Sequence, residues 1–285
     1  MSTMFPRTTV GGVSLSRMII GTNWILGYSH TSVAADDYIK KIFSEPEAVC
    51  TLLTAYLSKG VDTLMAPYGQ STILQAGVKM AEDKCGQPIT IIDTPIINVG
   101  DSEADRREAA ATIKQSAQLG AKLCLPHHSS VEQLVCKHSQ TIERLPDYLA
   151  MIRDCGLVPG LSAHMPELVV YSDLNGYDVE TYIQLYNCMG FLMQVEVEYI
   201  NKVIWEAKRP VITIKPMAAG RVSPFVGITF NYATIRDCDM VAVGAFTAAE
   251  ALEDIEIGMA AIERRRADLE GRSSPNKTAI MGNLG

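Results

Sequence analysis

The chain of 285 residues lacks several features that would assign it to a secreted or membrane class. It has no uninterrupted apolar run of transmembrane length, and its start, MSTMFPRTTV, has no basic segment followed by an apolar one, as a signal peptide would. Its seven cysteines include no CxxC pair, which argues against a disulfide framework or a structural zinc site. We therefore expect a cytoplasmic protein with no membrane partner.

Positive charge is also scarce. The sequence has 25 Lys and Arg against 32 Asp and Glu, for a net charge of −7, and its one basic run is residues 264–266. A nucleic-acid footprint needs clustered excess basic residues, so we expect no nucleic-acid partner. The expected partner is a small-molecule substrate, and a homo-oligomer is compatible with the sequence.

Short apolar segments alternate with amphipathic ones along the chain. Continuous apolar runs of this length are typical of parallel strands that are buried on both faces. The predicted strands are residues 18–21, 61–66, 89–92, 121–125, 158–162, 182–186, 210–214 and 240–243. For the sixth strand, residues 191–197 are an alternative to 182–186.

Helix signals fall between these strands. A helix, a glycine and then a strand recur at Gly60, Gly86, Gly120 and Gly156, as expected of a repeated βα unit. Eight such units predict a single α/β domain, a (β/α)₈ TIM barrel over residues 1–271, with a short N-terminal hairpin and a flexible C-terminal tail at 272–285. An open doubly wound sheet is the alternative, but no GxGxxG follows the first strand.

Several of these segments resemble aldo-keto reductases. The opening VGGVSLSRMIIGT at 10–22 is similar to that family's hairpin and first strand. GVDT at 60–63, with Tyr68-Gly69, is similar to its second strand. Three further segments are similar to the family's βα turns. The fifth turn matches GLSAH at 160–164, and the seventh matches KPMAAG at 215–220. The last matches VG at 243–244 with TAAEALED at 247–254. HMPE after the fifth strand and KPMAAGR after the seventh also resemble an uncharacterised subgroup of such barrels.

The resemblance implies an NADP-linked oxidoreductase of the aldo-keto reductase superfamily that acts on a carbonyl or sugar-like substrate. That chemistry uses a Tyr as the acid and a His that orients the carbonyl. The resemblance matches the Tyr to Tyr68 and the His to His127 or His128. The tetrad is degenerate, because the Asp position falls near Met65 and the Lys position near Pro95. Ile214 stands where many members place a Tyr against the nicotinamide.

Activity in a barrel is concentrated at the carboxyl ends of its strands. His127, His128 and His164 are candidate acids or bases, because an imidazole titrates near neutrality. Lys215 could bind an anion, form a Schiff base if burial lowers its pKa, or form a salt bridge with Asp93 or Glu167. The predicted catalytic residues are Tyr68, Asp93, His127, His128, His164 and Lys215.

Two loops could bind the phosphate of NAD(P). Gly220 and Arg221 follow the seventh strand, and Gly244 and Thr247 follow the eighth, where barrels often hold phosphate on backbone N–H groups. The long loop 24–44, with His30, could fold over the mouth as a lid.

Two other functions remain open. A divalent metal held by His128, His164 and Glu167 would make the protein a metal-dependent lyase, isomerase or hydrolase. A non-catalytic barrel that binds a metabolite is the other alternative, because a fold does not by itself imply catalysis.

Overall fold

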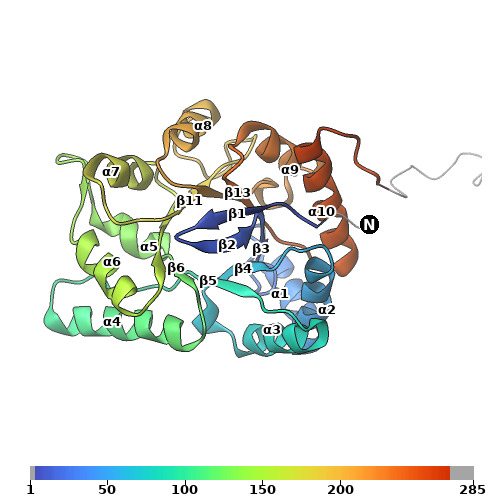
Figure 1. Ribbon diagram of the computed structural model, residues 1–285, viewed down its shortest axis with the longest axis horizontal. Coiled ribbons are helices and arrows are strands. Elements are labelled where there is room, and N and C mark those ends of the chain that lie inside the picture. Colours follow the sequence, from blue (N-terminus) through green and yellow to red (C-terminus); the bar gives the residue numbers. More distant parts are fainter. Residues whose placement is uncertain (1–3, 270–285) are drawn as a thin grey trace, which may run out of the picture.

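The structure is a computed structural model that describes residues 4–269, and it is a closed α/β barrel ringed by helices (Figure 1). The predicted tail 272–285 lies outside the described residues. Among the residues that are described, no helix is long and apolar enough to cross a membrane.

All strands of the central sheet pair in parallel. In spatial order they are β10 (Leu161–Ala163), β11 (Tyr182–Leu185), β12 (Val211–Ile214), β13 (Met240–Val243), β3 (Met18–Gly21), β4 (Thr63–Ala66), β5 (Thr90–Asp93), β6 (Leu123–Cys124) and β9 (Val158–Pro159). Because β9 and β10 are one fifth strand interrupted at Gly160, the first and last positions of this order join and the barrel closes. All eight predicted strands are confirmed, including the sixth at 182–186 rather than 191–197.

The inside of the barrel is filled with apolar side chains. Strand alternation sends every second residue inward, and the inward set packs as one cluster. It includes Ile19, Ile92, Leu123, Ile183 and Ile212. The barrel is therefore a packed core with no pore, and a cavity can form only above this layer.

The predicted N-terminal hairpin closes one end of the barrel. Strand β1 (Arg7–Val10) pairs antiparallel with β2 (Val13–Ser16), and the pair lies across the barrel in Figure 1. Val10 and Leu15 join the interior cluster, and Arg7 Nη1 binds Asp62 Oδ2 at 2.8 Å, just before β4 begins. The hairpin thus blocks the amino ends of the strands and leaves the carboxyl ends open for a site.

Helices cover the outside of the barrel. They are α1 (Val33–Ile42), α2 (Pro46–Leu57), α3 (Thr72–Cys85), α4 (Glu103–Gln118), α5 (His128–Val131), α6 (Leu145–Asp154), α7 (Glu167–Asn175), α8 (Val197–Glu206), α9 (Pro224–Thr234) and α10 (Ala248–Glu263). A small second hairpin, β7 (Val135–Cys136) with β8 (Thr141–Ile142), follows α5. The predicted stop at Gly86 is confirmed, since this glycine ends α3 with a left-handed φ of 66°.

Candidate functional site

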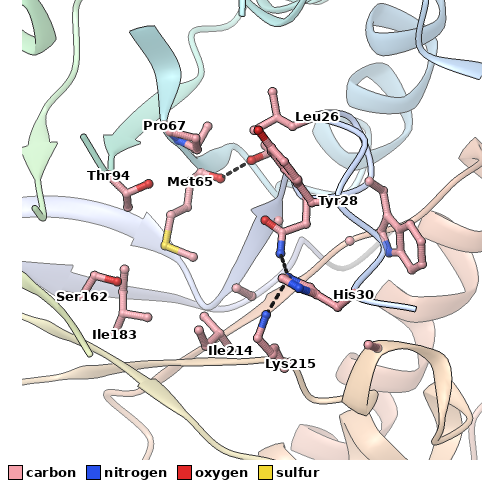
Figure 2. A pocket seen from close by; sticks show the side chains of 18 of the residues that line it. Leu26, Tyr28, His30, Met65, Pro67, Thr94, Ser162, Ile183, Ile214 and Lys215 are labelled. Atoms are coloured by element: carbon pink, nitrogen blue, oxygen red, sulfur yellow. Dashed lines mark hydrogen bonds between the residues drawn. The ribbon is translucent and has the colours of Figure 1, made fainter. Parts of the chain in front are cut away.

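A cavity of about 410 Å³ opens at the carboxyl ends of the strands, opposite the hairpin (Figure 2). This volume lies within the range of small-ligand pockets. Its floor is apolar and is made by inward side chains at the top of the packed interior: Met65, Ile183, Ile214 and Ala242.

The polar part of the wall contains no carboxylate among the described residues. It carries one amine, four imidazoles and several neutral donors. These side chains are Lys215, His30, His127, His128, His164, Asn23, Ser162, Thr22 and Thr94. The cavity can therefore be neutral or cationic, but its own lining gives it no negative charge.

Lys215 enters the cavity from an unusual backbone conformation. It follows β12 directly with a left-handed φ of 59°, although it precedes Pro216, where extended backbone is usual. Ala218 and Ala219 also have left-handed φ values, of 48° and 55°. Each such residue costs on the order of 1–2 kcal/mol, and strain of this kind gathers at functional sites.

His30 ties the loop after β3 to Lys215. Lys215 Nζ lies 2.9 Å from His30 Nε2, and Asn23 Nδ2 lies 3.0 Å from the same nitrogen (Figure 2). An ammonium and an amide nitrogen can only donate, so His30 Nε2 accepts and the neutral ring carries its proton on Nδ1. This places a neutral base against the lysine amine.

Burial changes the acidity of both groups. It lowers the pKa of Lys215 to about 8, because no carboxylate compensates for the lost hydration. Burial also lowers the pKa of His30, and the charge of Lys215 adds to this effect. Near neutral pH the lysine is therefore partly an uncharged amine and His30 is neutral.

The other three imidazoles form a cluster in which the rings of His128 and His164 are stacked and that of His127 is tilted against His128. The ring of His128 lies 3.7 Å from that of His164 and 4.2 Å from that of His127, between centroids. Burial first, and then His128, lowers the pKa of His127 and of His164 to about 4. Both rings are thus neutral at pH 7 and can donate or accept one proton each.

Glu132 holds this stack in place from behind. Its Oε1 accepts backbone N–H bonds from His164 at 2.6 Å and Met165 at 2.8 Å, and its Oε2 lies 3.4 Å from His128 Nδ1. Burial opposes the charged carboxylate, but the bonds from His128 and from the two N–H groups outweigh it and lower the pKa of Glu132. Sequence reasoning missed Glu132, although its position four residues after His128 on one helical turn was a usable signal.

Two of the predicted catalytic residues are not in the cavity. Tyr68 packs between the barrel and its helices, where burial raises its pKa to about 12. Asp93 follows the inward-facing Ile92, so alternation sends its side chain outward, where Oδ1 accepts the Tyr68 N–H at 2.8 Å. Asp93 therefore fixes the loop after β4, and the site has no Tyr acid at this position.

Glu167 does not join the other two proposed metal ligands. It is not among the cavity-lining residues, and Lys137 Nζ binds its Oε1 at 2.7 Å. His128 and His164 do lie together, with their rings stacked face to face. Within residues 4–269, no group of three or more His, Cys, Asp and Glu side chains is arranged to hold a metal ion. The predicted pairing of Lys215 with Asp93 or Glu167 is likewise wrong, since both carboxylates are engaged elsewhere.

The residues predicted to bind NAD(P) fit a dinucleotide poorly. Gly220 and Gly244 do line the cavity, but Arg221 lies over the ring of Phe191 at 4.2 Å. Thr247 caps the Glu250 N–H at the start of α10, and the Glu250 carboxylate accepts the Phe246 N–H at 2.8 Å. A phosphate there would face a carboxylate and compete with it for backbone donors.

Trp24 adds to this misfit. Its ring lies 4.1 Å from that of Phe246, and a Cβ on Gly244 would meet its Cδ1 at 2.7 Å. The indole therefore occupies the space above the turn that follows β13. The first part of the predicted loop 24–44 does line the mouth, at Trp24, Tyr28 and His30. Residues 33–42 instead form helix α1, so the segment is not one long loop.

The fold is similar to that of solved aldo-keto reductases. A protein designated an aldo-keto reductase from Pseudomonas aeruginosa has a TM-score of 0.63 at 14% identity, covering 92% of this chain and 97% of its own. The glycerol dehydrogenase of Gluconobacter oxydans has a TM-score of 0.56 at 11% identity, covering 95% and 99%. An aldo/keto reductase of Klebsiella pneumoniae, solved with NADP and acetate, has a TM-score of 0.54 at 14% identity, covering 99% and 95%.

These likenesses define the class by fold. The chain is an aldo-keto reductase-like (β/α)₈ barrel. No protein-family model and no curated sequence matches it.

Proposed function

We propose that this protein is an enzyme that binds a small carbonyl compound carrying a carboxylate and moves protons at or beside the carbonyl group. The single observation that carries the proposal is the wall of the cavity, which gathers Lys215 and four histidines and, within residues 4–269, includes no acidic residue. A buried wall of this composition favours a negatively charged ligand, because an anion meets donors there and no like charge.

The histidines supply the acid and base. Neutral imidazoles such as those of His127 and His164 can accept a proton at one nitrogen and donate from the other. The apolar floor of Met65, Ile183 and Ile214 excludes water beneath the substrate, which strengthens each polar contact. Proton abstraction from the carbon next to a carbonyl is the reaction that this arrangement supports best.

The test uses 2-oxobutyrate as the probe. Proton NMR in D₂O would follow exchange of its C3 hydrogens, and we expect the wild type to accelerate exchange at least tenfold over buffer. His164→Gln, which keeps a neutral polar side chain, should lower this rate at least tenfold, whereas His138→Gln should not change it because His138 does not line the cavity. No acceleration by the wild type, together with no saturable binding of 2-oxobutyrate, would overturn the proposal.

Nicotinamide-linked carbonyl reduction is the second candidate, favoured by the fold shared with the NADP-bound Klebsiella structure. It is tested by NADPH titration of Trp24 fluorescence in a Trp205→Phe background, since Trp205 lies outside the cavity. From the poor fit at Arg221, Glu250 and Trp24 we expect no saturation at millimolar NADPH. Saturable micromolar quenching would instead establish the reductase alternative.

A further inference from the structure

We propose that Lys215 is a covalent catalyst, whose Nζ forms an imine with the carbonyl carbon of a 2-oxo acid. The inference rests on the proposed function, which names the cavity and the carbonyl substrate, and it adds the atom that reacts. The argument depends on where the amine lies, what surrounds it and what takes its proton.

Lys215 is placed as a reactant and not as a structural cation. Its side chain lines the cavity beside the apolar Ile214, and among the described residues no carboxylate forms an ion pair with it. A structural lysine normally pairs with an acid, as Lys137 does with Glu167 in this chain. The strained backbone at Lys215, Ala218 and Ala219 further indicates that this amine is held in the cavity at a cost to stability.

The partner of the amine suits imine formation. His30 Nε2 lies 2.9 Å from Lys215 Nζ and is an acceptor, because Asn23 Nδ2 also donates to it. Burial lowers the pKa of Lys215 to about 8, so about one molecule in four carries the free amine at pH 7.5. An ordinary exposed lysine would supply about one in a thousand at that pH.

The reaction balances with these groups, the substrate and one proton from solvent. Nζ attacks the carbonyl carbon, forming a C–N bond, while the C=O π electrons move to oxygen. Nζ loses one proton to His30 Nε2, and the His30 imidazolium passes that proton to the oxygen to give a neutral carbinolamine. A second proton, from solvent water, converts the hydroxyl into a leaving water as the nitrogen lone pair forms the C=N bond, so that amine, ketone and one proton become a protonated imine and water.

The imine explains why the cavity combines a lysine with neutral histidines. A protonated imine withdraws electrons from the neighbouring carbon, so a base such as His164 or His127 can remove a proton from that carbon at lower cost. The substrate carboxylate compensates the charge of the iminium, which the wall itself leaves uncompensated.

The experiment traps the imine in the full-length protein. Wild type is incubated with 2-oxobutyrate and sodium cyanoborohydride at pH 7.5, and adducts are located by intact mass and peptide mapping. We expect one adduct per chain, on Lys215, forming at least 30-fold faster than any adduct on Lys137. Lys215→Met should lose this adduct, and Lys137→Met should retain it.

His30→Gln provides a second variant that keeps Lys215 in place. Its amide can still accept a hydrogen bond but cannot take up a proton, so trapping should slow at least fivefold while circular dichroism stays unchanged. Hydrogen exchange of 2-oxobutyrate without an adduct on Lys215 would overturn the imine and leave the proposed function standing. Labelling of Lys215 and Lys137 at equal rates would overturn it as well.

Discussion

Lys215 Nζ and His30 Nε2 lie 2.9 Å apart across the mouth of the barrel, although 185 positions separate the two residues in the chain. Lys215 follows β12, and His30 lies in the loop between β3 and α1. His30 has a left-handed φ of 55°, and its neighbour Ser29 donates its backbone N–H to Asp36 Oδ1 at 2.7 Å. The contact therefore joins two strained segments that the rest of the fold holds in position.

The first prediction concerns the reactivity of Lys215 with pH. Because burial lowers its pKa to about 8, its reaction with an amine-directed acylating reagent should rise between pH 6 and 9 with a midpoint near 8. Peptide mass spectrometry measures the rate at each lysine. Lys137 is the internal control, since the hydrogen bond and charge of Glu167 raise its pKa above the ordinary lysine value, so its reactivity should still be rising beyond the Lys215 midpoint. A shared midpoint for both lysines would contradict the burial argument.

The second prediction concerns stability. Lys215 loses its proton at about pH 8 in the folded chain but only near pH 10.5 in the unfolded chain. Below pH 8 the amine is charged in both states, and burial of that charge destabilises the folded state by its full amount. Lys215→Met removes this penalty and should raise the free energy of unfolding at pH 7 by about 3 kcal/mol, as seen in urea melts. Lys137→Met removes an exposed ammonium from its pair with the largely buried Glu167 and has no burial penalty to relieve, so it should not raise the free energy of unfolding. Destabilisation by Lys215→Met would show that the amine contributes to folding.

The third prediction concerns acid. His127 and His164 have folded pKa values of about 4, below the ordinary 6.5, so the unfolded chain binds more protons between those limits. The free energy of unfolding should therefore fall as pH drops through this window, by about 2 kcal/mol for each of the two histidines between pH 7 and 5. A His127→Gln/His164→Gln double variant should lose most of this dependence. An unchanged pH profile in the double variant would place the acid sensitivity elsewhere.

The fourth prediction separates the two roles of Glu132. Glu132→Ala leaves the N–H groups of His164 and Met165 without their acceptor and should cost about 2–3 kcal/mol in a thermal or urea melt. Glu132→Gln keeps an acceptor oxygen and should cost less. Both variants should lower the rate of 2-oxobutyrate exchange, because the stacked histidines lose their support. If Glu132→Gln matches wild type in exchange rate, the charge on Glu132 has no part in positioning His128.

Local sequence determined the order and placement of the elements. Short apolar runs bounded by glycine were sufficient to predict all eight strands, because a strand buried on both faces needs continuous apolar side chains whatever lies around it. The same logic predicted the short N-terminal hairpin, whose turn at Gly11-Gly12 has φ values of 53° and 82° that favour glycine. It also placed His127, His128, His164 and Lys215 at the carboxyl end of the barrel.

Only the tertiary structure decided which strand-end residues share the cavity. Asp93 ends the right strand but faces the helices, because side chains alternate along a strand and a shift of one residue reverses the direction. Tyr68 begins a short 3-10 turn after β4 and is buried in the outer core. Lys215 departs from that alternation through a left-handed backbone that its sequence position before Pro216 does not predict. His30 reaches Lys215 only because the loop after β3 folds across the mouth, and a contact over so many positions has no signature in the local pattern of either segment.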